Sequence, residues 1–323
     1  MTRELTLAHV EQKARATEND RPLDPSRRKF LGMFAAATAG SAALAGCGGG
    51  DADALEKKSL NWEEYFKKNY RLMTDEEKRE TVERLERLWE LQNEGTIQVS
   101  SKNAVKGVLY GYAFNISKCQ GYMDCVKACV EENNTDRDTD MQYIRIFEMK
   151  DGKVDFHNGD SHFAHEVPAA GHFYIGTQCM QCEQPPCTEV CPVSATWKEP
   201  DGIVVVDYDW CIGCRYCEAA CPYFARRFNF KEPSVPESEI NRNQHYLGNR
   251  LRRKGVMEKC HFCIQRTRDG QLPACADACP TGARVFGNLL DPDSEIRWVL
   301  KNKKVFRLKE DLGTEPKFWY FMD

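Results

Sequence analysis

The sequence lacks an excess of basic residues, extended runs of large apolar residues and the common motifs of nucleotide chemistry. Lys and Arg number 45 against 49 Asp and Glu, and the net charge of -4 argues against a nucleic-acid partner, which needs basic residues to neutralise phosphates. A mean hydropathy of -0.61 excludes a polytopic membrane protein. No phosphate-binding glycine loop, dinucleotide fingerprint or nucleophile–base constellation is recognisable. No Cys-x-x-Cys is followed by His, which argues against attached c-type haem.

Cysteine, by contrast, is abundant. The chain has 16 Cys among 323 residues, a share above ordinary usage but below that of a small disulfide scaffold. The length suits one large domain or two modest ones. The spacing of the cysteines therefore has to decide between a metal cofactor and a disulfide framework.

The first 46 residues have the pattern of an export signal. A twin-arginine pattern at Ser26–Leu31 follows a polar leader, and an uncharged stretch runs from Phe30 to Gly50. The stretch is long enough for a retained membrane anchor, but Ala and Gly dominate it, which favours a cleaved signal. It ends in Leu44-Ala45-Gly46-Cys47, which resembles a lipobox; the alternative is a cleavage region of small residues that happens to contain Cys. We expect residues 1–46 to be removed and a lipid on Cys47 to hold the protein on the periplasmic side of the cytoplasmic membrane.

Residues 47–106 are predicted to form a linker and a helical extension. Gly, Asp and Lys are frequent in 48–58, whereas 60–94 has apolar residues at helical spacing and a capping box from Thr74 to Glu77. An amphipathic helix that packs on the main body is favoured over a dedicated docking helix.

Strand and turn signals follow. Residues 107–118 have the pattern of a strand that leads into the first cysteine run. A hairpin is predicted from Met141–Met149 and Lys153–His157 around Asp151-Gly152. A second hairpin is predicted from Ala195–Lys198 and Ile203–Asp207 around Asp201-Gly202.

Two polar segments complete the chain. Residues 231–259 have the composition of a polar insertion that ends in a basic run, Arg250, Arg252, Arg253 and Lys254. This run is interpreted as a solvated face, with a contact to anionic headgroups or to an acidic partner as the alternative. Residues 291–323 alternate charged and aromatic residues and are expected to wrap the surface as a C-terminal tail.

Four cysteine runs recur between residues 107 and 290, which is an internal repeat. The third run has gaps of two, two and three residues and Pro after its last Cys. The second and fourth runs follow this plan with a longer gap before their third Cys, and the first has Tyr122 where a second Cys is expected. The runs are Cys119-x5-Cys125-x3-Cys129, Cys179-x2-Cys182-x4-Cys187-x3-Cys191, Cys211-x2-Cys214-x2-Cys217-x3-Cys221 and Cys260-x2-Cys263-x11-Cys275-x3-Cys279.

These spacings indicate iron–sulfur clusters. The third run is that of bacterial ferredoxins, in which three thiolates hold one [4Fe–4S] cluster and the fourth ligates another. Zinc sites use two pairs of ligands separated by a longer loop, and disulfides do not require Cys-x-x-Cys repeats followed by Pro, so both alternatives are disfavoured. Twin-arginine export carries folded proteins, so the clusters can be inserted in the reducing cytoplasm.

With these motifs the chain resembles the four-cluster iron–sulfur subunits of polysulfide, tetrathionate and dimethyl sulfoxide reductases and of alternative complex III. The resemblance covers Gly107–Leu290 and Gly313–Phe318, and besides the runs it rests on Gln184–Cys187, Tyr208–Cys214 and Glu258–Cys260. It implies an α+β fold, a pseudo-symmetric double domain like two bacterial two-cluster ferredoxins, with inserted β-hairpins and the N-terminal helical extension.

The resemblance also implies an exchange of ligands between runs one and four and between runs two and three. Each cluster takes three thiolates from one run and one from its partner. The implied sets are Cys179, Cys182, Cys187 and Cys221; Cys211, Cys214, Cys217 and Cys191; Cys260, Cys263, Cys275 and Cys129; and Cys119, Cys125 and Cys279.

The last set is one thiolate short, which departs from the family pattern. We expect three [4Fe–4S] clusters and one [3Fe–4S] cluster whose empty corner faces Tyr122. The alternatives are a [4Fe–4S] cluster with an oxygen ligand from Tyr122 or Asp124, or loss of this cluster. In the molybdenum-enzyme relatives this end faces the catalytic subunit, so the departure argues against a molybdopterin partner of the usual kind.

The expected function is electron relay without catalysis by this chain. The resemblance implies one partner that is a polytopic, quinone-reactive membrane subunit of the polysulfide reductase type. The other would be a periplasmic redox protein, either a multihaem cytochrome c or a molybdopterin reductase. The alternatives are a free periplasmic polyferredoxin carrier, a reductase that uses the open cluster corner, and a structural zinc protein.

Overall fold

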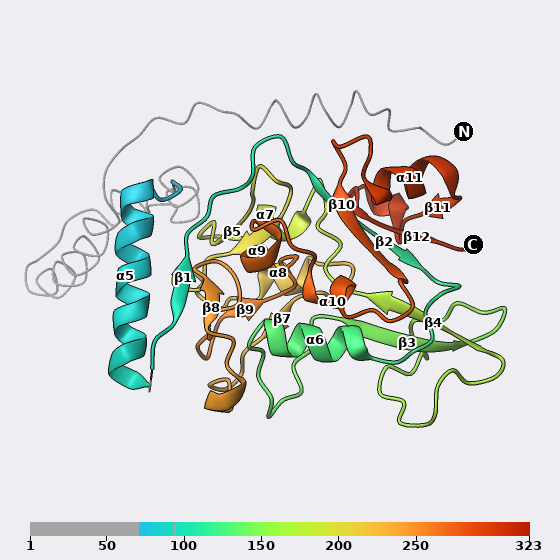
Figure 1. Cartoon of the computed structure of the whole chain (residues 1–323), viewed down its shortest axis with the longest axis horizontal. Helices are drawn as coiled ribbons and strands as arrows, with labels where there is room; N and C mark the ends of the chain where they lie inside the picture. Colours follow the sequence, from blue (N-terminus) through green and yellow to red (C-terminus); the bar gives the residue numbers. More distant parts are fainter. Residues whose placement is uncertain (1–70, 94) are drawn as a thin grey trace, which may run out of the picture.

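The computed structural model describes residues 71–93 and 95–323 (Figure 1). The twin-arginine pattern, Cys47 and the predicted helical residues 60–70 lie outside this part. Among the described residues, no helix combines the length and the apolarity needed to cross a membrane. The elements are α5 (Asp75–Gln92), β1 (Gln98–Ser100), β2 (Tyr110–Asn115), α6 (Asp124–Glu132), β3 (Arg145–Lys150), β4 (His172–Thr177), α7 (Pro186–Glu189), β5 (Thr196–Lys198), β6 (Val204–Val206), α8 (Tyr216–Ala219), β7 (Arg227–Phe228), η1 (Glu237–Glu239), β8 (Asn243–His245), β9 (Met257–Glu258), α9 (Ile264–Thr267), α10 (Ala274–Asp277), β10 (Arg284–Asn288), α11 (Glu295–Asn302), β11 (Val305–Phe306), η2 (Glu310–Leu312) and β12 (Phe318–Phe321).

Helix α5 stands at one edge of the molecule beside β1 (Figure 1). The predicted capping box is confirmed: the Thr74 hydroxyl accepts from the Glu77 amide, and the Glu77 carboxylate accepts from the Thr74 amide. This cap places the helix start at Asp75, so the prediction of helix before Thr74 is wrong for residues 71–74. Trp89 is buried on the inner face, as expected for an amphipathic helix that packs on the body.

A four-stranded sheet in the order β10-β2-β12-β11 carries the main core. The predicted strand at 107–118 is confirmed over Tyr110–Asn115, where all six residues are buried. Strand β12 runs parallel to β2, with Phe318 and Tyr320 fully buried. The expectation that 291–323 only wraps the surface is therefore wrong, because the aromatic residues at its end form a strand of this core sheet.

One predicted hairpin is confirmed and the other is wrong. Strands β5 and β6 pair antiparallel around Asp201-Gly202, as expected. Strand β3 turns at Asp151-Gly152 but pairs with β4, not with Lys153–His157. The physical reason is burial: β4 supplies four consecutive buried residues, whereas 153–157 has none.

The segment 231–259 is polar in composition but its second half is buried. Arg252 forms an ion pair with Glu258 at 2.5 Å, and both side chains are inaccessible to solvent. Glu258 also accepts hydrogen bonds from Tyr143 and Asn229. The interpretation of the basic run as a solvated face is wrong for Arg252 and holds for Arg253 and Lys254, which are exposed.

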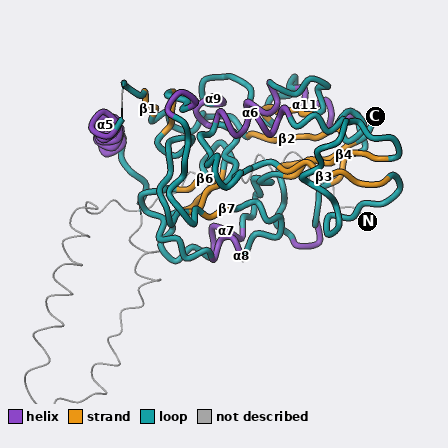
Figure 2. The backbone as a smooth tube through the Cα atoms, turned by 90° about the horizontal axis from the view of Figure 1, so that it is seen from below, coloured by secondary structure: helices purple, strands orange, loops and turns teal. Residues whose placement is uncertain are grey.

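Away from the four-stranded sheet, the body is made of two-stranded sheets, short helices and long loops (Figure 2). The fold is thus a mixture of helix and strand, as predicted. The cysteines lie on the loops and on the short helices that follow them, α6 to α8 and α10. Seven of the fifteen described cysteines are buried within one large apolar cluster.

Candidate iron–sulfur sites

The fifteen described cysteines, Cys119 to Cys279, form no disulfide. Their thiols lie close enough to interact electrostatically within four groups, and each group draws on two runs. These are the sets that the resemblance implies. We name them the Tyr122 group (Cys119, Cys125, Cys279), the Cys275 group (Cys129, Cys260, Cys263, Cys275), the Cys187 group (Cys179, Cys182, Cys187, Cys221) and the Cys214 group (Cys191, Cys211, Cys214, Cys217).

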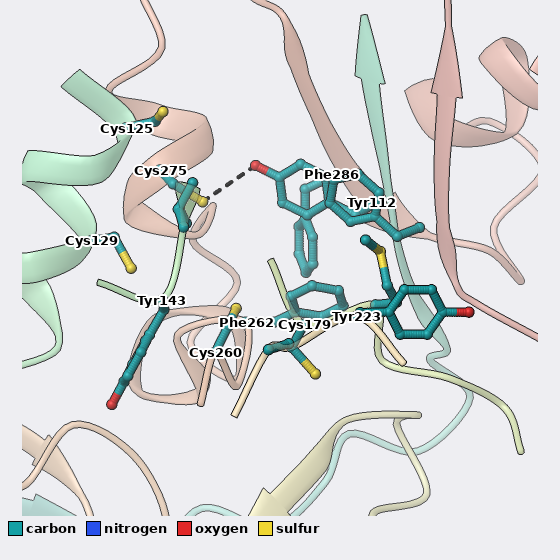
Figure 3. Packing of buried hydrophobic residues seen from close by; sticks show 14 of the residues in the cluster. Tyr112, Cys125, Cys129, Tyr143, Cys179, Tyr223, Cys260, Phe262, Cys275 and Phe286 are labelled. Carbon is teal, nitrogen blue, oxygen red and sulfur yellow. Dashed lines mark hydrogen bonds between the residues drawn. The ribbon is translucent and has the colours of Figure 1, made fainter. Parts of the chain in front are cut away.

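The four groups follow one another in a line. Cys125 of the Tyr122 group interacts with Cys275, and Cys260 of the Cys275 group interacts with Cys179. In Figure 3, Cys125, Cys275, Cys260 and Cys179 succeed one another beside the aromatic rings of Tyr112 and Phe262. The line continues from the Cys187 group to Cys217 of the Cys214 group. The order is therefore Tyr122 group, Cys275 group, Cys187 group, Cys214 group.

Burial divides the line into a middle and two ends. All eight thiols of the Cys275 and Cys187 groups are buried. The partly or fully exposed thiols all belong to the end groups: Cys119 and Cys279 at one end, Cys211 and Cys214 at the other. Water is excluded from the middle, while each end reaches the surface.

The loops that present the thiols share a backbone feature. The second residue after the first Cys of each run has positive φ, at Gly121, Gln181, Gly213 and Phe262. This left-handed residue turns the chain so that the next position can face the same side as the first Cys. Glycine accepts such a φ without strain, whereas Gln and Phe must be held there by their surroundings.

Tyr122 occupies the position of the missing ligand, but its side chain is directed elsewhere. It is 41% exposed, and its hydroxyl donates a hydrogen bond to Oε1 of Gln120. Asp124, two residues further on, begins α6 and lines the same hollow as Cys119. Three thiols, and no fourth, surround the Tyr122 site within the described part of the chain.

Each end group encloses a hollow lined by its cysteines. The hollows at the Tyr122 and Cys214 groups each contain about 330 Å³ of space, part of it open to solvent. Two buried arginines, Arg226 and Arg284, line them and have side-chain nitrogens without a hydrogen-bond partner in the described structure. A negatively charged cluster ligated by thiolates fits both observations.

The electrostatics of the thiols suit the same cofactor. Burial, followed by the charge of Cys179, raises the pKa of Cys182 to about 12, and burial raises the pKa of Cys217 to about 11. Such thiols keep their protons unless a metal centre stabilises the thiolates, so cluster insertion releases protons.

Several hydrogen-bond donors to the thiols are not recognisable from the cysteine spacing. The Tyr112 hydroxyl lies 3.3 Å from the sulfur of Cys275, and the Asn133 amide lies 3.5 Å from that of Cys129. Arg226 donates to the sulfur of Cys187 at 2.9 Å. Only the arginines have a sequence signal, because each follows a Cys-Pro pair at a fixed distance.

Comparisons with known proteins agree with this site. Residues 170–250 and 246–289 match the 4Fe-4S dicluster domain. One of the subunits of selenate reductase from Mesobacillus selenatarsenatis is 36% identical, over 75% of this chain and 80% of the relative. A putative iron-sulfur subunit of dimethyl sulfoxide reductase from Halobacterium salinarum is 39% identical, over 65% and 78%. The iron-sulfur cluster-binding subunit of menaquinone reductase from Nitratidesulfovibrio vulgaris is 35% identical, over 66% and 88%.

The matches extend over most of each relative, and the matched domain spans the second, third and fourth cysteine runs. Together with the thiol groups, they identify iron–sulfur clusters as the cofactor. This chain therefore belongs to the family of iron–sulfur electron-transfer subunits found in dimethyl sulfoxide reductase and menaquinol oxidoreductase complexes.

Proposed function

We propose that this chain relays single electrons through four clusters in a line, between a membrane partner and a periplasmic partner. The observation that carries the proposal is the burial pattern: eight buried thiols in the middle and partly exposed thiols only at the two ends. A buried middle keeps water and oxidants from the clusters, while exposed ends let electrons enter and leave. The clusters supply one-electron redox chemistry when bound.

In this relay the protein holds the clusters in place and shields them from water. Thiolates from two runs fix each cluster, so the clusters are tied in two pairs, the Tyr122 group with the Cys275 group and the Cys187 group with the Cys214 group. Phe262 and Tyr112 pack beside the Cys275 group with their ring centroids 5.7 Å apart and exclude water from it. Each described thiol already lies near the other thiols of its group.

The proposed cofactor content is three [4Fe–4S] clusters and one [3Fe–4S] cluster in the Tyr122 group. Support comes from the three thiols there and from the hydrogen bond that turns the Tyr122 hydroxyl toward Gln120. A missing ligand removes the iron at that corner and changes the charge and potential of the cluster. Asp124 remains the alternative source of an oxygen ligand, because it lines the hollow.

The Cys214 end is the proposed contact with a polytopic, quinone-reactive membrane subunit. Three large apolar side chains, Ile212, Tyr216 and Phe230, are each more than 60% exposed at this end: the first two belong to its cysteine loop, and Arg215 of that loop lies over the Phe230 ring. Exposed apolar side chains gathered in one region are typical of a surface that a permanent partner covers. They favour a fixed partner over a free polyferredoxin carrier.

The Tyr122 end would then face a periplasmic redox protein. A multihaem cytochrome c or a molybdopterin subunit is proposed there, and the relatives named as subunits of selenate and dimethyl sulfoxide reductases support the second type.

We further propose twin-arginine export, removal of residues 1–46 and a lipid on Cys47 at the periplasmic face of the membrane. The repeated positive φ in the four cysteine loops supports a pseudo-symmetric double domain over 107–290, preceded by the helical extension at 47–106.

The first experiment is iron and sulfide analysis with EPR on mature protein purified without oxygen. About fifteen irons with an oxidised-state [3Fe–4S] signal support the proposed content. About sixteen irons without that signal contradict the open corner, and a colourless protein with zinc contradicts the relay itself.

Partners and location need separate measurements. After gentle detergent extraction, native electrophoresis should place the chain in a complex with haem or molybdopterin; migration near its own mass would indicate a free carrier. Mass spectrometry of the mature N-terminus should find an acylated Cys47, and an unmodified N-terminus would contradict the lipid anchor.

A further inference from the structure

Each half of the cysteine framework contains one buried arginine at an equivalent position. Arg226 is the fifth residue after Cys221, and Arg284 is the fifth residue after Cys279. In both segments Pro follows the Cys, a residue with positive φ comes third, and a buried Ala comes fourth. The same turn therefore delivers a guanidinium to the interior twice.

Arg226 lies between the Cys187 and Cys214 groups. Only 2% of the residue is exposed. Its Nη2 donates to the sulfur of Cys187 and to the hydroxyl of Thr196, both at 2.9 Å. Its Nε and Nη1 have no hydrogen-bond partner among the described residues. Burial alone lowers the pKa of Arg226, but the negative charge of Cys187 and Cys217 outweighs it and raises the pKa above its usual value.

Arg284 lies between the Tyr122 and Cys275 groups. Its Nη1 donates to the side-chain oxygen of Gln178 at 2.8 Å and lies 3.5 Å from the hydroxyl of Tyr112. That hydroxyl is the one 3.3 Å from the sulfur of Cys275, so the guanidinium reaches this thiol through Tyr112. Its Nη2 has no partner within the described structure. Burial lowers the pKa of Arg284, and the charges of Cys125, Tyr112 and Cys275 raise it well above the usual value.

Neither guanidinium has a carboxylate partner within residues 71–93 and 95–323. The other deeply buried arginines do: Arg252 pairs with Glu258, and Arg268 pairs with Asp201 at 3.1 Å. A buried charge without a counterion strongly destabilises a fold. The thiolates, and the negative clusters they hold, are the only counterions that face Arg226 and Arg284 in this part of the chain.

We propose that Arg226 and Arg284 are positioning residues of the relay that raise the reduction potentials of the two clusters on either side of each. This inference rests on the proposed function. Reduction adds a negative charge to a cluster, and a fixed positive charge beside it stabilises the reduced form. Arg226 acts more strongly, because it donates a charge-assisted hydrogen bond directly to a thiolate, whereas Arg284 acts through Tyr112.

The test is a potentiometric titration of the complete mature protein followed by EPR. Arg226→Met should lower two of the four midpoint potentials and leave the [3Fe–4S] midpoint unchanged. Arg284→Met should lower the other two, the [3Fe–4S] midpoint among them. For Arg226→Met the reduction constant of the more affected cluster should fall about tenfold, which corresponds to about 59 mV for a one-electron couple.

Two further variants separate charge from packing. Arg226→Lys keeps the charge and should restore most of the potential. Arg250→Met removes an arginine that pairs with Asp209 and donates to no thiol in the described structure, and it should move no midpoint.

The outcomes are distinct. Unchanged potentials in loaded Arg226→Met protein, or an equal shift in Arg226→Lys, overturn the proposal. Loss of iron in both Arg226→Met and Arg226→Gln assigns Arg226 to cluster assembly and also overturns it. Absence of clusters from the unmodified protein instead refutes the proposed function.

Discussion

The two ends of the line use one loop design with different ligand content. In the Tyr122 group, Gly121 and Met123 have positive φ on either side of Tyr122; in the Cys214 group, Gly213 and Arg215 do the same around Cys214. Both loops then enter a helix, α6 or α8. The loop conformation therefore does not depend on the fourth thiolate, and the number of ligands can change while the fold is kept.

The surroundings of the two ends differ more than their loops. The Tyr122 group lies against the four-stranded sheet and is followed by the nine-residue α6. The Cys214 group lies against the short strands β5, β6 and β9 and is followed by the four-residue α8. Local support is thus greater at the end that has fewer thiols.

Exchanging the two residues at the second ligand position should have the largest effect. Tyr122→Cys supplies a fourth thiolate on a loop already shaped for it, so the [3Fe–4S] signal should disappear and the iron content should rise to about sixteen. Cys214→Tyr should do the reverse at the other end and add a second [3Fe–4S] signal. EPR of the oxidised proteins with iron analysis measures both.

Two control variants decide whether oxygen ligates the cluster. Tyr122→Phe and Asp124→Asn should leave the [3Fe–4S] signal unchanged, because neither residue is expected to bind iron. If the unmodified protein has sixteen irons and one of these variants creates a [3Fe–4S] signal, that residue is the fourth ligand.

We expect the loss of stability on Gly→Ala substitution in these loops to depend on which atoms the added Cβ would meet. A Cβ on Gly213 would lie 2.1 Å from the Gly255 carbonyl oxygen, a backbone atom, whereas one on Gly121 would meet the Tyr174 ring at 2.6 Å. Gly282 also has positive φ, but nothing lies within 4 Å of its Cβ position. We expect Gly213→Ala to destabilise by roughly 3–5 kcal/mol, Gly121→Ala by less, and Gly282→Ala by about 1–2 kcal/mol, the cost of the φ alone.

The measurement is the midpoint temperature at which the visible absorbance of the clusters is lost. Equal midpoints for Gly213→Ala and Gly282→Ala would mean that the chain near Gly255 yields, and that the Cys214 loop is more adaptable than its contacts indicate.

How far the sequence predicts this molecule depends on the range of the interaction. Predictions from local signals are confirmed: the Thr74 cap and the β5–β6 hairpin lie where their residues indicate, because both are decided within a few positions. The pairing of strands that are far apart in the sequence is not predicted correctly. Strand β3 joins β4 across a loop of more than twenty residues, and β12 enters the sheet beside β2, because burial of aromatic and aliphatic side chains outweighs the nearest turn.

The composition of the thiol groups is predictable from the cysteine spacing together with the family resemblance, since each run presents its thiols on one short loop. The burial of the two arginines is not predictable from the sequence: each is the fifth residue after the last Cys of its run, but an arginine at that position can be solvated or buried. Arg252 illustrates the difficulty: Arg253 and Lys254 beside it are exposed, whereas Arg252 is buried with Glu258 and with the backbone carbonyls of Asn133 and Asn134.

Removal of iron should begin at the Cys214 end. Cys214 is exposed and Cys211 partly so, and α8 gives this loop little support. A ferrous chelator followed by thiol alkylation and mass spectrometry should label the Cys214 group several-fold faster than the Tyr122 group, and both before the middle groups. Earlier labelling of the Tyr122 group would mean that the missing ligand matters more for lability than exposure does.

The smallest expected effect lies outside both ends, in the cap of α5, and it tests whether the helical extension is independent of them. Arg71 lowers the pKa of Glu77 from its usual 4.5 to about 2. Because the folded-state pKa is depressed, this carboxylate stabilises the protein above about pH 4.5, and the contribution is lost as the pH falls toward 2. Partial exposure of the Arg71 and Glu77 side chains limits this stabilisation to about 0.5–1 kcal/mol. Glu77→Gln should therefore shift the unfolding of α5 slightly at neutral pH and leave every cluster signal unchanged; a changed EPR spectrum would show that α5 supports the Cys214 end through the Arg84–Asp209 ion pair.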